Sequence, residues 1–291
     1  MRAGSIPSVK SLKDIFFDEQ GCITWLFEQA ILEDVTTCDE CAGNVKRYGK
    51  MFKCTHVTCK NCWSIFRATF FAGMRIKCCE ALYMCYLWLT GCSAATMLAH
   101  TGHSAHTVSS YNGFFRQLVA STLDSDDMII GGAGIVVQVD ETKMGRRKYN
   151  KGHRVEGAWV IVGVELTDER RVFAEVMEDR SASTIADVLS RHIAEGSILH
   201  TDCWRGYTPV AEQFGIKHQT VNHSVGFKDE NTGVHTNHVE GTNYALKRAV
   251  PPRNRTREHL QPFLLEFVWM GKNEDHLWQS LVDALRDVVY E

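Results

Sequence analysis

The stretch GIVVQVDET, residues 134–142, decides the fold because it is an apolar, β-branched run that ends in acidic residues. Such a run predicts a buried β-strand with Asp140 and Glu141 at its end. Two similar runs follow, and their sequences are GAWVIVGVEL at 157–166 and RVFAEVMED at 171–179. Polar segments separate the three runs, which indicates three strands of an antiparallel meander.

Helical and strand patterns alternate after this meander. Their order is SASTIADVLSRHI (181–193, helix), SILHTDCW (197–204, strand), TPVAEQFG (208–215, helix), KHQTVNHS (217–224, strand) and HTNHVEGTNYALKRAV (235–250, helix). This order predicts a mixed α/β fold with helices on the faces of one sheet. The acidic and then Gly-rich break DSDDMIIGGAG at 124–134 marks its start, and we assign residues 124–291 to this domain with its C-terminal helices.

Three acids occupy related places in this pattern. Asp140 ends the first strand, Asp202 ends the fourth, and Glu240 lies on the last helix. The first and fourth strands can lie side by side in a mixed sheet, so we expect a converging trio. Converging carboxylates repel one another, and a divalent cation relieves the repulsion. Oxygen ligands select Mg²⁺ or Mn²⁺ over zinc, and two such ions suit in-line attack on a phosphodiester.

Other interpretations of these residues remain open. Each acid alone can be a solvated strand-end carboxylate, and Glu141 competes with Asp140 for the first ligand position. Strand alternation does not decide between them, because both faces of a central strand can be buried. A zinc hydrolase site is disfavoured, because no HxxxH pair accompanies its candidate ligands, which are His200, Cys203, His235 and His238.

Eleven cysteines are unevenly distributed, with ten at or before Cys92. In a large intracellular chain this clustering favours metal ligation over disulfides. Cys38 and Cys41 form a CxxC pair, whose two-residue gap lets both sulfurs reach one zinc ion. The second pair is ambiguous, and its candidates are Cys54 with Cys59, Cys59 with Cys62 and, less strongly, His56. We therefore predict one structural zinc ion in a ribbon at residues 37–78.

Residues 79–123 predict three helices, with the sequences CEALYMCYLWLTG, SAATMLAHTG and SAHTVSSYNGFFRQLVASTL. Ser104 is suited to cap the third helix, and a turn with Gly102 joins that helix to the second. This pattern fits a helix-turn-helix whose third helix enters the major groove, where we assign His106 and Ser109 to DNA contact. The alternative is a bundle that only links its neighbours.

The net charge of −3 excludes a uniformly basic protein, yet the cations are clustered. Residues 42–79 hold cations and no acidic residue, and two further clusters begin at Lys143 and Lys247. Basic surfaces suit phosphate backbones, because each neutralised phosphate releases counterions. We therefore assign DNA contacts to Arg146, Arg147, Lys148, Lys247, Arg248, Arg253 and Arg255. Asn237, one turn before Glu240 on the same helical face, is assigned with them.

Residues 1–36 predict an amphipathic helix at about 23–32 and show no function. No apolar run is long and uncharged enough to span a bilayer, and the N-terminal residues lack the apolar block of a secretion signal. We therefore expect a soluble intracellular protein with no membrane partner. It would lie in the nucleus of a eukaryotic host, or in the cytoplasm or nucleoid of a bacterial one.

The ordered motifs VQVDET, LHTDCWRGY, HTNHVEGTNYALKR, PPRNR and FLLEFVW resemble Merlin-type DNA transposases and the related bacterial insertion-sequence transposases with an ISXO2-like DDE domain. The likeness covers nearly the whole chain, including the CxxC pair, and the spacing from Glu240 to Lys247 matches the family's acid-plus-lysine ending. It implies an RNase H-like core in which Asp140, Asp202 and Glu240 are the DDE metal ligands. It also implies that Lys247 contacts DNA.

The resemblance further implies that Cys54 and Cys59 are the second zinc pair. Together, the residues and the resemblance predict a DNA transposase whose ribbon and helix-turn-helix bind terminal inverted repeats. Its two-metal site would hydrolyse a strand at the end of the element, and the freed 3′-hydroxyl would attack target DNA. Joining two ends implies at least a homodimer on double-stranded DNA. The alternatives are a catalytically silent DNA-binding regulator derived from a transposase and a nuclease that cuts without joining.

Overall fold

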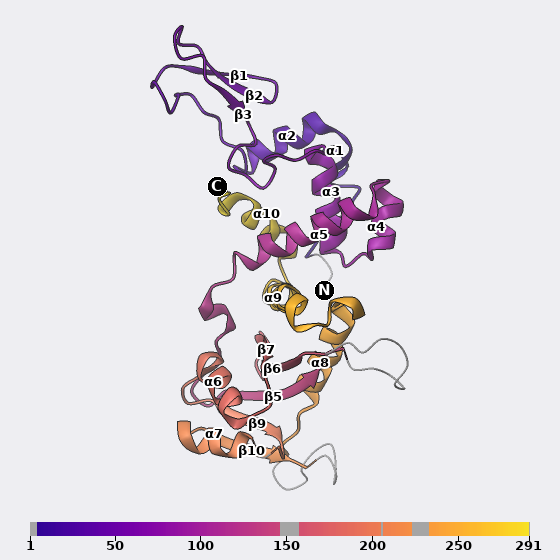
Figure 1. Cartoon of the computed structure of the whole chain (residues 1–291), viewed down its shortest axis with the longest axis vertical. Coiled ribbons are helices and arrows are strands. Elements are labelled where there is room, and N and C mark those ends of the chain that lie inside the picture. Colours follow the sequence, from indigo (N-terminus) through magenta and orange to yellow (C-terminus); the bar gives the residue numbers. More distant parts are fainter. Residues whose placement is uncertain (1–4, 146–156, 205, 223–232, 291) are drawn as a thin grey trace. The chain divides into compact units, whose positions relative to one another are not determined.

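The computed structural model, shown in Figure 1, describes residues 5–145, 157–204, 206–222 and 233–290. The chain forms two compact units, which comprise residues 1–122 with 273–291, and residues 123–272. Each unit has its own secondary structure and its own core. No helix in the described part of the chain is both long and apolar enough to cross a membrane.

The second unit is built on a five-stranded mixed sheet in the order β10-β9-β5-β6-β7. β5 (Val136–Lys143), β6 (Trp159–Glu165) and β7 (Val172–Met177) pair antiparallel, as the meander pattern predicts. β9 (Ile198–Asp202) pairs in parallel with β5 on one side and with β10 (Lys217–Val221) on the other. The predicted adjacency of the first and fourth strands is therefore confirmed, because the chain crosses back from β7 at one edge of the sheet and pairs β9 with β5.

Helices cover both faces of this sheet (Figure 1). They are α6 (Ala182–His192), α7 (Tyr207–Phe214), α8 (Asn237–Ala249) and α9 (Arg257–Lys272). Alternation along β6 separates two cores, because Ile161 packs with α6 and α7, whereas Val160 and Val162 pack with α8 and α9. Short elements complete the unit, namely η1 (Ser125–Met128), β4 (Ile130–Gly131), β8 (Ile193–Ala194) and η2 (Pro252–Asn254).

A buried carboxylate stabilises the end of β6. Glu165 is 1% exposed, and it accepts hydrogen bonds from the Arg171 guanidinium at 2.9 and 3.0 Å, the Gly131 amide at 2.9 Å and the Thr167 hydroxyl at 2.7 Å. Burial alone would raise the pKa of this carboxyl, but the hydrogen bonds outweigh it and hold the pKa below its ordinary value. The ionised form of Glu165 is therefore favoured by folding.

The variant Glu165→Gln is expected to lose roughly 1 to 2 kcal/mol of stability at neutral pH, after allowance for solvent screening at the partly exposed Arg171. Because the pKa is lowered in the folded state, this contribution is complete above the ordinary Glu pKa of about 4.3 and disappears as the pH falls through the folded-state value. Urea unfolding at pH 7 and at pH 3 measures both. An equal loss at the two pH values would contradict the assignment.

The first unit contains the three helices predicted for residues 79–123. They are α3 (Cys78–Leu89), α4 (Ala94–Thr101) and α5 (Ala105–Ala120). The Ser104 hydroxyl accepts a hydrogen bond from the Thr107 amide, so the predicted cap of the third helix is confirmed. Gly102 ends α4 with a φ of 69°, a left-handed conformation that glycine adopts without a Cβ clash.

The amphipathic helix near the N-terminus begins earlier than the sequence pattern indicates. α1 (Lys13–Phe17) precedes it, and the helix itself, α2, spans Glu19–Glu28 and not 23–32. Asp18 sets the start, because its side chain accepts a hydrogen bond from the Gly21 amide. Beyond the end of α2, Ala30 has a φ of 56°, which is incompatible with a continuing helix.

The last helix, α10 (Leu277–Asp287), packs within the first unit, although the domain predicted from the sequence runs from 124 to 291. An aromatic cluster explains this placement. The Trp278 ring lies 6.2 Å from Phe16, 6.1 Å from Trp25 and 5.9 Å from Tyr86, measured between ring centroids. The helix is amphipathic, so its apolar face needs such a partner, and the first unit supplies it.

Candidate functional site

Asp202 ends β9, whereas Asp140 lies within β5, three residues before its last residue, and not at the strand end that the sequence pattern indicates. The parallel register pairs Gln138 of β5 with His200 of β9. Two residues further on, the same register leads to Asp140 and Asp202. Val139 packs on the side of α6 and α7, so strand alternation turns Asp140 toward α8. The two strands thus bring two carboxylates from distant parts of the sequence to one edge of the sheet.

The pKa of Asp140 is raised to about 6. Burial of the carboxyl contributes most, and the negative charges of Glu141 and Asp202 raise the pKa further, whereas the Glu141 amide and the Asn243 side chain lower it. Carboxylates that repel one another in a partly desolvated place are stabilised by a divalent cation. Their oxygen donors suit Mg²⁺ or Mn²⁺. Asp140 and Asp202 therefore fit such a cation.

Glu240 lies in the first turn of α8 and is exposed. Its Oε1 accepts a hydrogen bond from the Thr236 hydroxyl at 2.9 Å. Asn243, one turn further along α8, donates from Nδ2 to Oδ2 of Asp140 at 2.8 Å, so this part of the helix lies against β5 at Asp140. Glu240 is thus one turn from a residue that holds Asp140. The three acids are not gathered into a compact ligand group in the described residues.

Glu141 is held on the side of the sheet opposite to Asp140, as expected of strand neighbours. Its side chain is fully buried, and Oε2 accepts a hydrogen bond from Arg180 Nη2 at 2.8 Å. The Arg180 guanidinium lies 4.7 Å from the centroid of the Trp159 ring and 4.3 Å from that of the Trp204 ring. Glu141 is therefore committed to an ion pair, which favours Asp140 as the ligand on the α8 side.

Three side chains around these acids carry no assignment from the sequence, and they are Gln138, Asn243 and Arg180. Gln138 is the single polar residue in the run IVVQV, and this interruption is a signal of a polar contact in a buried strand. Asn243 follows Glu240 by three residues and so shares its helical surface. Arg180 offers no signal, because its contact with Glu141 joins residues 39 positions apart.

The four candidate ligands of a zinc hydrolase site do not come together as a ligand group in the described residues. His200 is bonded through Nε2 to the Gln219 side chain at 3.0 Å. The rings of His235 and His238 stack on each other with centroids 5.6 Å apart. Cys203 is exposed and faces the backbone carbonyl of Val221 at 3.4 Å. Each of the four side chains thus has a contact of its own, and these contacts do not join them into one site.

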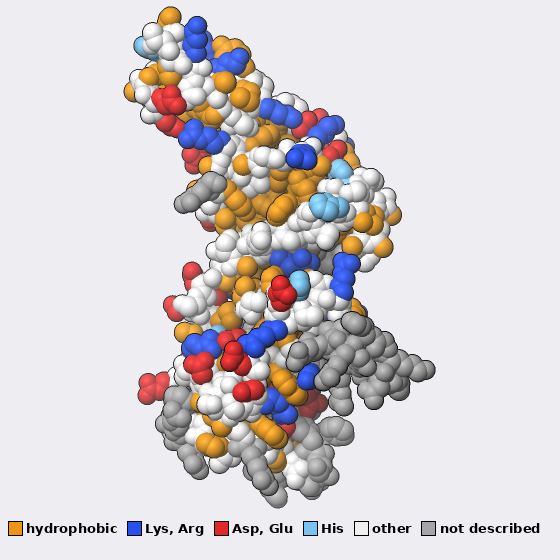
Figure 2. Space-filling view, in the orientation of Figure 1, with side chains coloured by type: hydrophobic (Ala, Val, Ile, Leu, Met, Phe, Trp, Pro, Cys, Tyr) orange, Lys and Arg blue, Asp and Glu red, His pale blue; other side chains and the backbone are white. Residues whose placement is uncertain are grey.

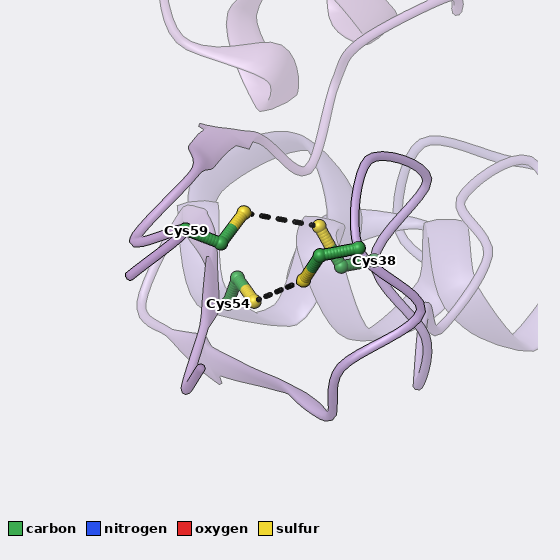
Figure 3. Close-up of side chains that lie close together, drawn as sticks. Cys38, Cys54 and Cys59 are labelled. Carbon is green, nitrogen blue, oxygen red and sulfur yellow. Dashed lines mark hydrogen bonds between the residues drawn. The ribbon is translucent and has the colours of Figure 1, made fainter. Parts of the chain in front are cut away.

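A second site lies in the first unit, on the small antiparallel sheet of β1 (Val45–Tyr48), β2 (Met51–Cys54) and β3 (Cys62–Ser64). The sulfurs of Cys38, Cys41, Cys54 and Cys59 lie within 4.8 Å of one another. The Sγ atoms of Cys38 and Cys59 are 3.8 Å apart, and those of Cys41 and Cys54 are 3.4 Å apart. Figure 3 shows the side chains of Cys38, Cys54 and Cys59 pointing toward a common centre. Tetrahedral Zn–S bonds of about 2.3 Å place sulfurs about 3.8 Å apart. The four thiols therefore fit one zinc ion.

The sheet explains which cysteines meet. Cys54 ends β2 opposite Val45, which places its sulfur beside the turn that carries Cys38 and Cys41. Cys62 instead begins β3 and is exposed, and it is not part of the group. His56 is also outside the group, and its Nδ1 contacts the Thr58 hydroxyl at 3.0 Å. The structure thus gathers the set that the family resemblance implies.

The side chains assigned to DNA contact have different surroundings. Those that are exposed are His106 and Ser109 on α5, Asn237 and Arg248 on α8, and Arg253. Lys247 is half-buried. Arg255 donates to the backbone carbonyls of Lys247 and Val250, so its guanidinium caps the end of α8. Arg146, Arg147 and Lys148 lie outside the described residues. Figure 2 shows Lys and Arg over both units on the face in view.

Comparison with known proteins shows the family to which the chain belongs. The model of the ISXO2-like transposase domain matches residues 122–271, just over half of the chain. A chain of a simian T-cell lymphotropic virus intasome, solved in complex with PP2A regulatory subunit B56 gamma, is 14% identical, with 71% of this chain and 64% of that chain covered and a TM-score of 0.26. A chain of a pre-cleavage Mos1 transpososome is 12% identical, with 70% and 78% covered and a TM-score of 0.22.

Such TM-scores are too low to establish a shared fold. This chain spans less than two thirds of the length of the intasome chain. No curated protein matches the sequence. The family match covers β5, β9 and α8, which carry the three acids, and it ends within α9.

Proposed function

We propose that this chain, which belongs to the ISXO2-like transposase family, is a DNA transposase that cuts DNA at the ends of a mobile element and joins them to a target. The placement of Asp140 and Asp202 on neighbouring parallel strands, at the edge that α8 approaches, carries the proposal. With Glu240 from α8, these acids form the proposed DDE triad. The sheet order, with three antiparallel strands followed by two parallel ones, supports an RNase H-like core.

The proposed chemistry uses these acids as ligands. Two Mg²⁺ or Mn²⁺ ions held by Asp140, Asp202 and Glu240 would activate the nucleophile and stabilise the leaving oxygen of a phosphodiester. Other groups of the chain hold the carboxylates of Asp140 and Asp202 in position. Asn243 holds the Asp140 carboxylate, and the Trp204 amide donates to Oδ1 of Asp202 at 2.9 Å. Water is the first nucleophile and releases a 3′-hydroxyl, which then attacks target DNA, so no protein nucleophile is required.

DNA recognition is assigned to the first unit and to the basic residues near α8. In this proposal one zinc ion stabilises the four-cysteine ribbon, and α3 to α5 form a helix-turn-helix with His106 and Ser109 facing the terminal inverted repeat. Both side chains are exposed on α5, which supports this role. Lys247, Arg248 and Arg253 would contact phosphates near the acids and make binding sensitive to salt.

The proposal includes assembly and location. Two element ends must be joined in one event, so we expect at least a homodimer on double-stranded DNA. The nucleus is the expected site of action in a eukaryotic host, and the cytoplasm or nucleoid is expected in a bacterial one.

The test is cleavage and joining of a labelled duplex that carries the repeat flanking the gene, with Mg²⁺ or Mn²⁺. The intact protein is expected to nick at the repeat boundary and to join that end to a plasmid. Glu240→Gln is expected to bind the same duplex with unchanged affinity and to lose both reactions by at least about a hundredfold, since it removes one metal ligand. Gel analysis of the labelled strand measures each step.

Glu258→Gln is the matched control, because Glu258 is also an exposed acid in the first turn of a helix of the same unit. This control is expected to cut and join like the intact protein. If the intact protein binds the repeat but cuts it with neither metal, the catalytic part of the proposal fails. The DNA-binding regulator then becomes the better account.

A further inference from the structure

Gln138 is fully buried on β5 and uses both ends of its amide group on the start of α8. Its Oε1 accepts hydrogen bonds from the backbone amides of His238 and Val239, at 3.0 and 3.1 Å. Its Nε2 donates to the backbone carbonyl of His235 at 2.7 Å. The first amides of a helix have no partner within the helix, and the N-cap side chain, Thr236, makes no capping bond. Gln138 therefore caps α8 from a neighbouring strand.

Asn243 makes a second attachment between the same two elements. It is 5% exposed, and its Nδ2 donates to Oδ2 of Asp140 at 2.8 Å. Gln138 and Asp140 are two residues apart and so lie on one face of β5. We call the two attachments, Gln138 to the amides of His238 and Val239 and Asn243 to Asp140, the α8 latch.

The spacing of the two attachments agrees between strand and helix. Two residues of a strand span about 6.6 Å. The four to five residues of α8 from the capped amides to Asn243 span about 6 to 7.5 Å at the helical rise of about 1.5 Å per residue. Both attachments can therefore be made at once without bending either element. Together they set the position of α8 along β5 and not only its distance from the sheet.

We propose that Gln138 is a positioning residue for the third acid. Glu240 lies on α8 between the capped amides and Asn243, so the α8 latch sets its place relative to Asp140 and Asp202. The inference rests on the proposed function, because it assumes that Glu240 acts together with the two aspartates. It assigns to Gln138 a role in holding the metal site without contact with the metal or the DNA.

The variant Gln138→Leu removes the cap and keeps a side chain of similar size. The amides of His238 and Val239 then lose their acceptor, and the first turn of α8 is free to shift. Cleavage of the bound repeat is expected to slow between about ten- and a hundredfold, because a misplacement of about 1 Å has an effect of this size. The affinity for the repeat is expected to stay unchanged. A slower reaction would then reflect the cleavage step in the bound complex and not weaker DNA binding.

Two measurements do not depend on cleavage. Hydrogen exchange of the His238 and Val239 amides is expected to be at least about tenfold faster in Gln138→Leu, because the local opening of α8 becomes easier. Calorimetry with Mn²⁺ alone is expected to show weaker binding to the protein, since Glu240 no longer meets the aspartates. A general loss of stability would not weaken Mn²⁺ binding at a temperature where the variant stays folded.

Ser197→Ala is the matched control. Ser197 is 2% exposed in the same unit, and its hydroxyl accepts from the Gly132 amide at 2.9 Å and donates to the Ala194 carbonyl at 2.6 Å. The variant thus loses buried hydrogen bonds between a side chain and the backbone, as Gln138→Leu does, but these bonds do not involve α8. This control is expected to unfold at a lower temperature, but to keep the cleavage rate, the α8 exchange rates and the affinity for Mn²⁺.

A double-mutant cycle with Asn243→Leu tests whether the two attachments act as one. If both work through the docking of α8, the double variant loses less cleavage rate than the product of the two single losses. Should leucine at position 138 prevent folding, Gln138→Asn provides the same comparison, because its amide is one methylene shorter and fails to reach the helix amides.

Separate outcomes bear on the two proposals. If Gln138→Leu exchanges faster at α8 but cuts DNA and binds Mn²⁺ like Ser197→Ala, the positioning role is refuted and the proposed function stands. If the intact protein cuts no DNA, the proposed function fails. In that case unchanged Mn²⁺ binding in Gln138→Leu also refutes the positioning role, whereas weaker binding supports it.

Discussion

The variant Asp140→Asn is expected to lose DNA strand cleavage by at least about a thousandfold, about 4 kcal/mol of transition-state stabilisation, because it removes a ligand of the proposed metal site. Folding is not expected to suffer. The pKa of Asp140 is raised to about 6 by burial and by the charges of Glu141 and Asp202, so its ionised form destabilises the folded state at neutral pH. A neutral amide removes that repulsion, and the thermal midpoint is expected to stay or to rise.

The variant Glu141→Gln tests the neighbouring acid, which is the other candidate for the same ligand position. Glu141 forms a buried ion pair with Arg180, so neutralising it leaves the guanidinium without its counter-charge. We expect a lower thermal midpoint and cleavage that persists at a temperature where the variant is folded. Cleavage assays with Mg²⁺ and thermal unfolding distinguish the two positions. The opposite pattern, with Asp140→Asn active and Glu141→Gln inactive but stable, would reassign the ligand to Glu141.

The second large effect is expected at the four-cysteine group. The purified protein is expected to contain one zinc ion per chain, and Cys54→Ser is expected to lose it and unfold the ribbon, because structural zinc contributes about 10 kcal/mol or more to the folding of such small modules. The core of the second unit is independent of these cysteines and is expected to persist. Metal analysis by mass spectrometry and limited proteolysis of residues 37–78 measure the two effects.

Cys62→Ser is the control that the chain itself provides. Cys62 forms a CxxC pair with Cys59 in the sequence, but it is exposed at the start of β3 and stands apart from the four gathered sulfurs. The control is expected to keep its zinc and its resistance to protease. Loss of zinc from Cys62→Ser, with zinc retained by Cys54→Ser, would show that the second ligand pair is Cys59 and Cys62.

Much of the second unit could be predicted because its signals are local. The β-branched, apolar runs that predict the three strands of the meander form β5, β6 and β7, because such residues favour buried strands. The order of elements allowed the pairing of β5 with β9, and the structure shows that pairing. Element ends were less predictable, and α2 shows why, since Asp18 and Ala30 set its limits through single contacts and dihedral angles.

The amino-acid sequence by itself determined which residues could serve a metal site and where strands and helices would form. It left open the choice between Asp140 and Glu141 and the choice of the second cysteine pair, and it assigned the last helix to the second unit. Tertiary contacts bear on the first two points and correct the third. Asp140 and Glu141 face opposite sides of the sheet. Asp140 therefore contacts Asn243, whereas Glu141 contacts Arg180. Pairing of β1 with β2 brings Cys54 to the CxxC turn. Contacts of Trp278 place α10 in the first unit. The physical reason is the same in each case, because which partner a side chain meets depends on contacts between residues far apart in the chain.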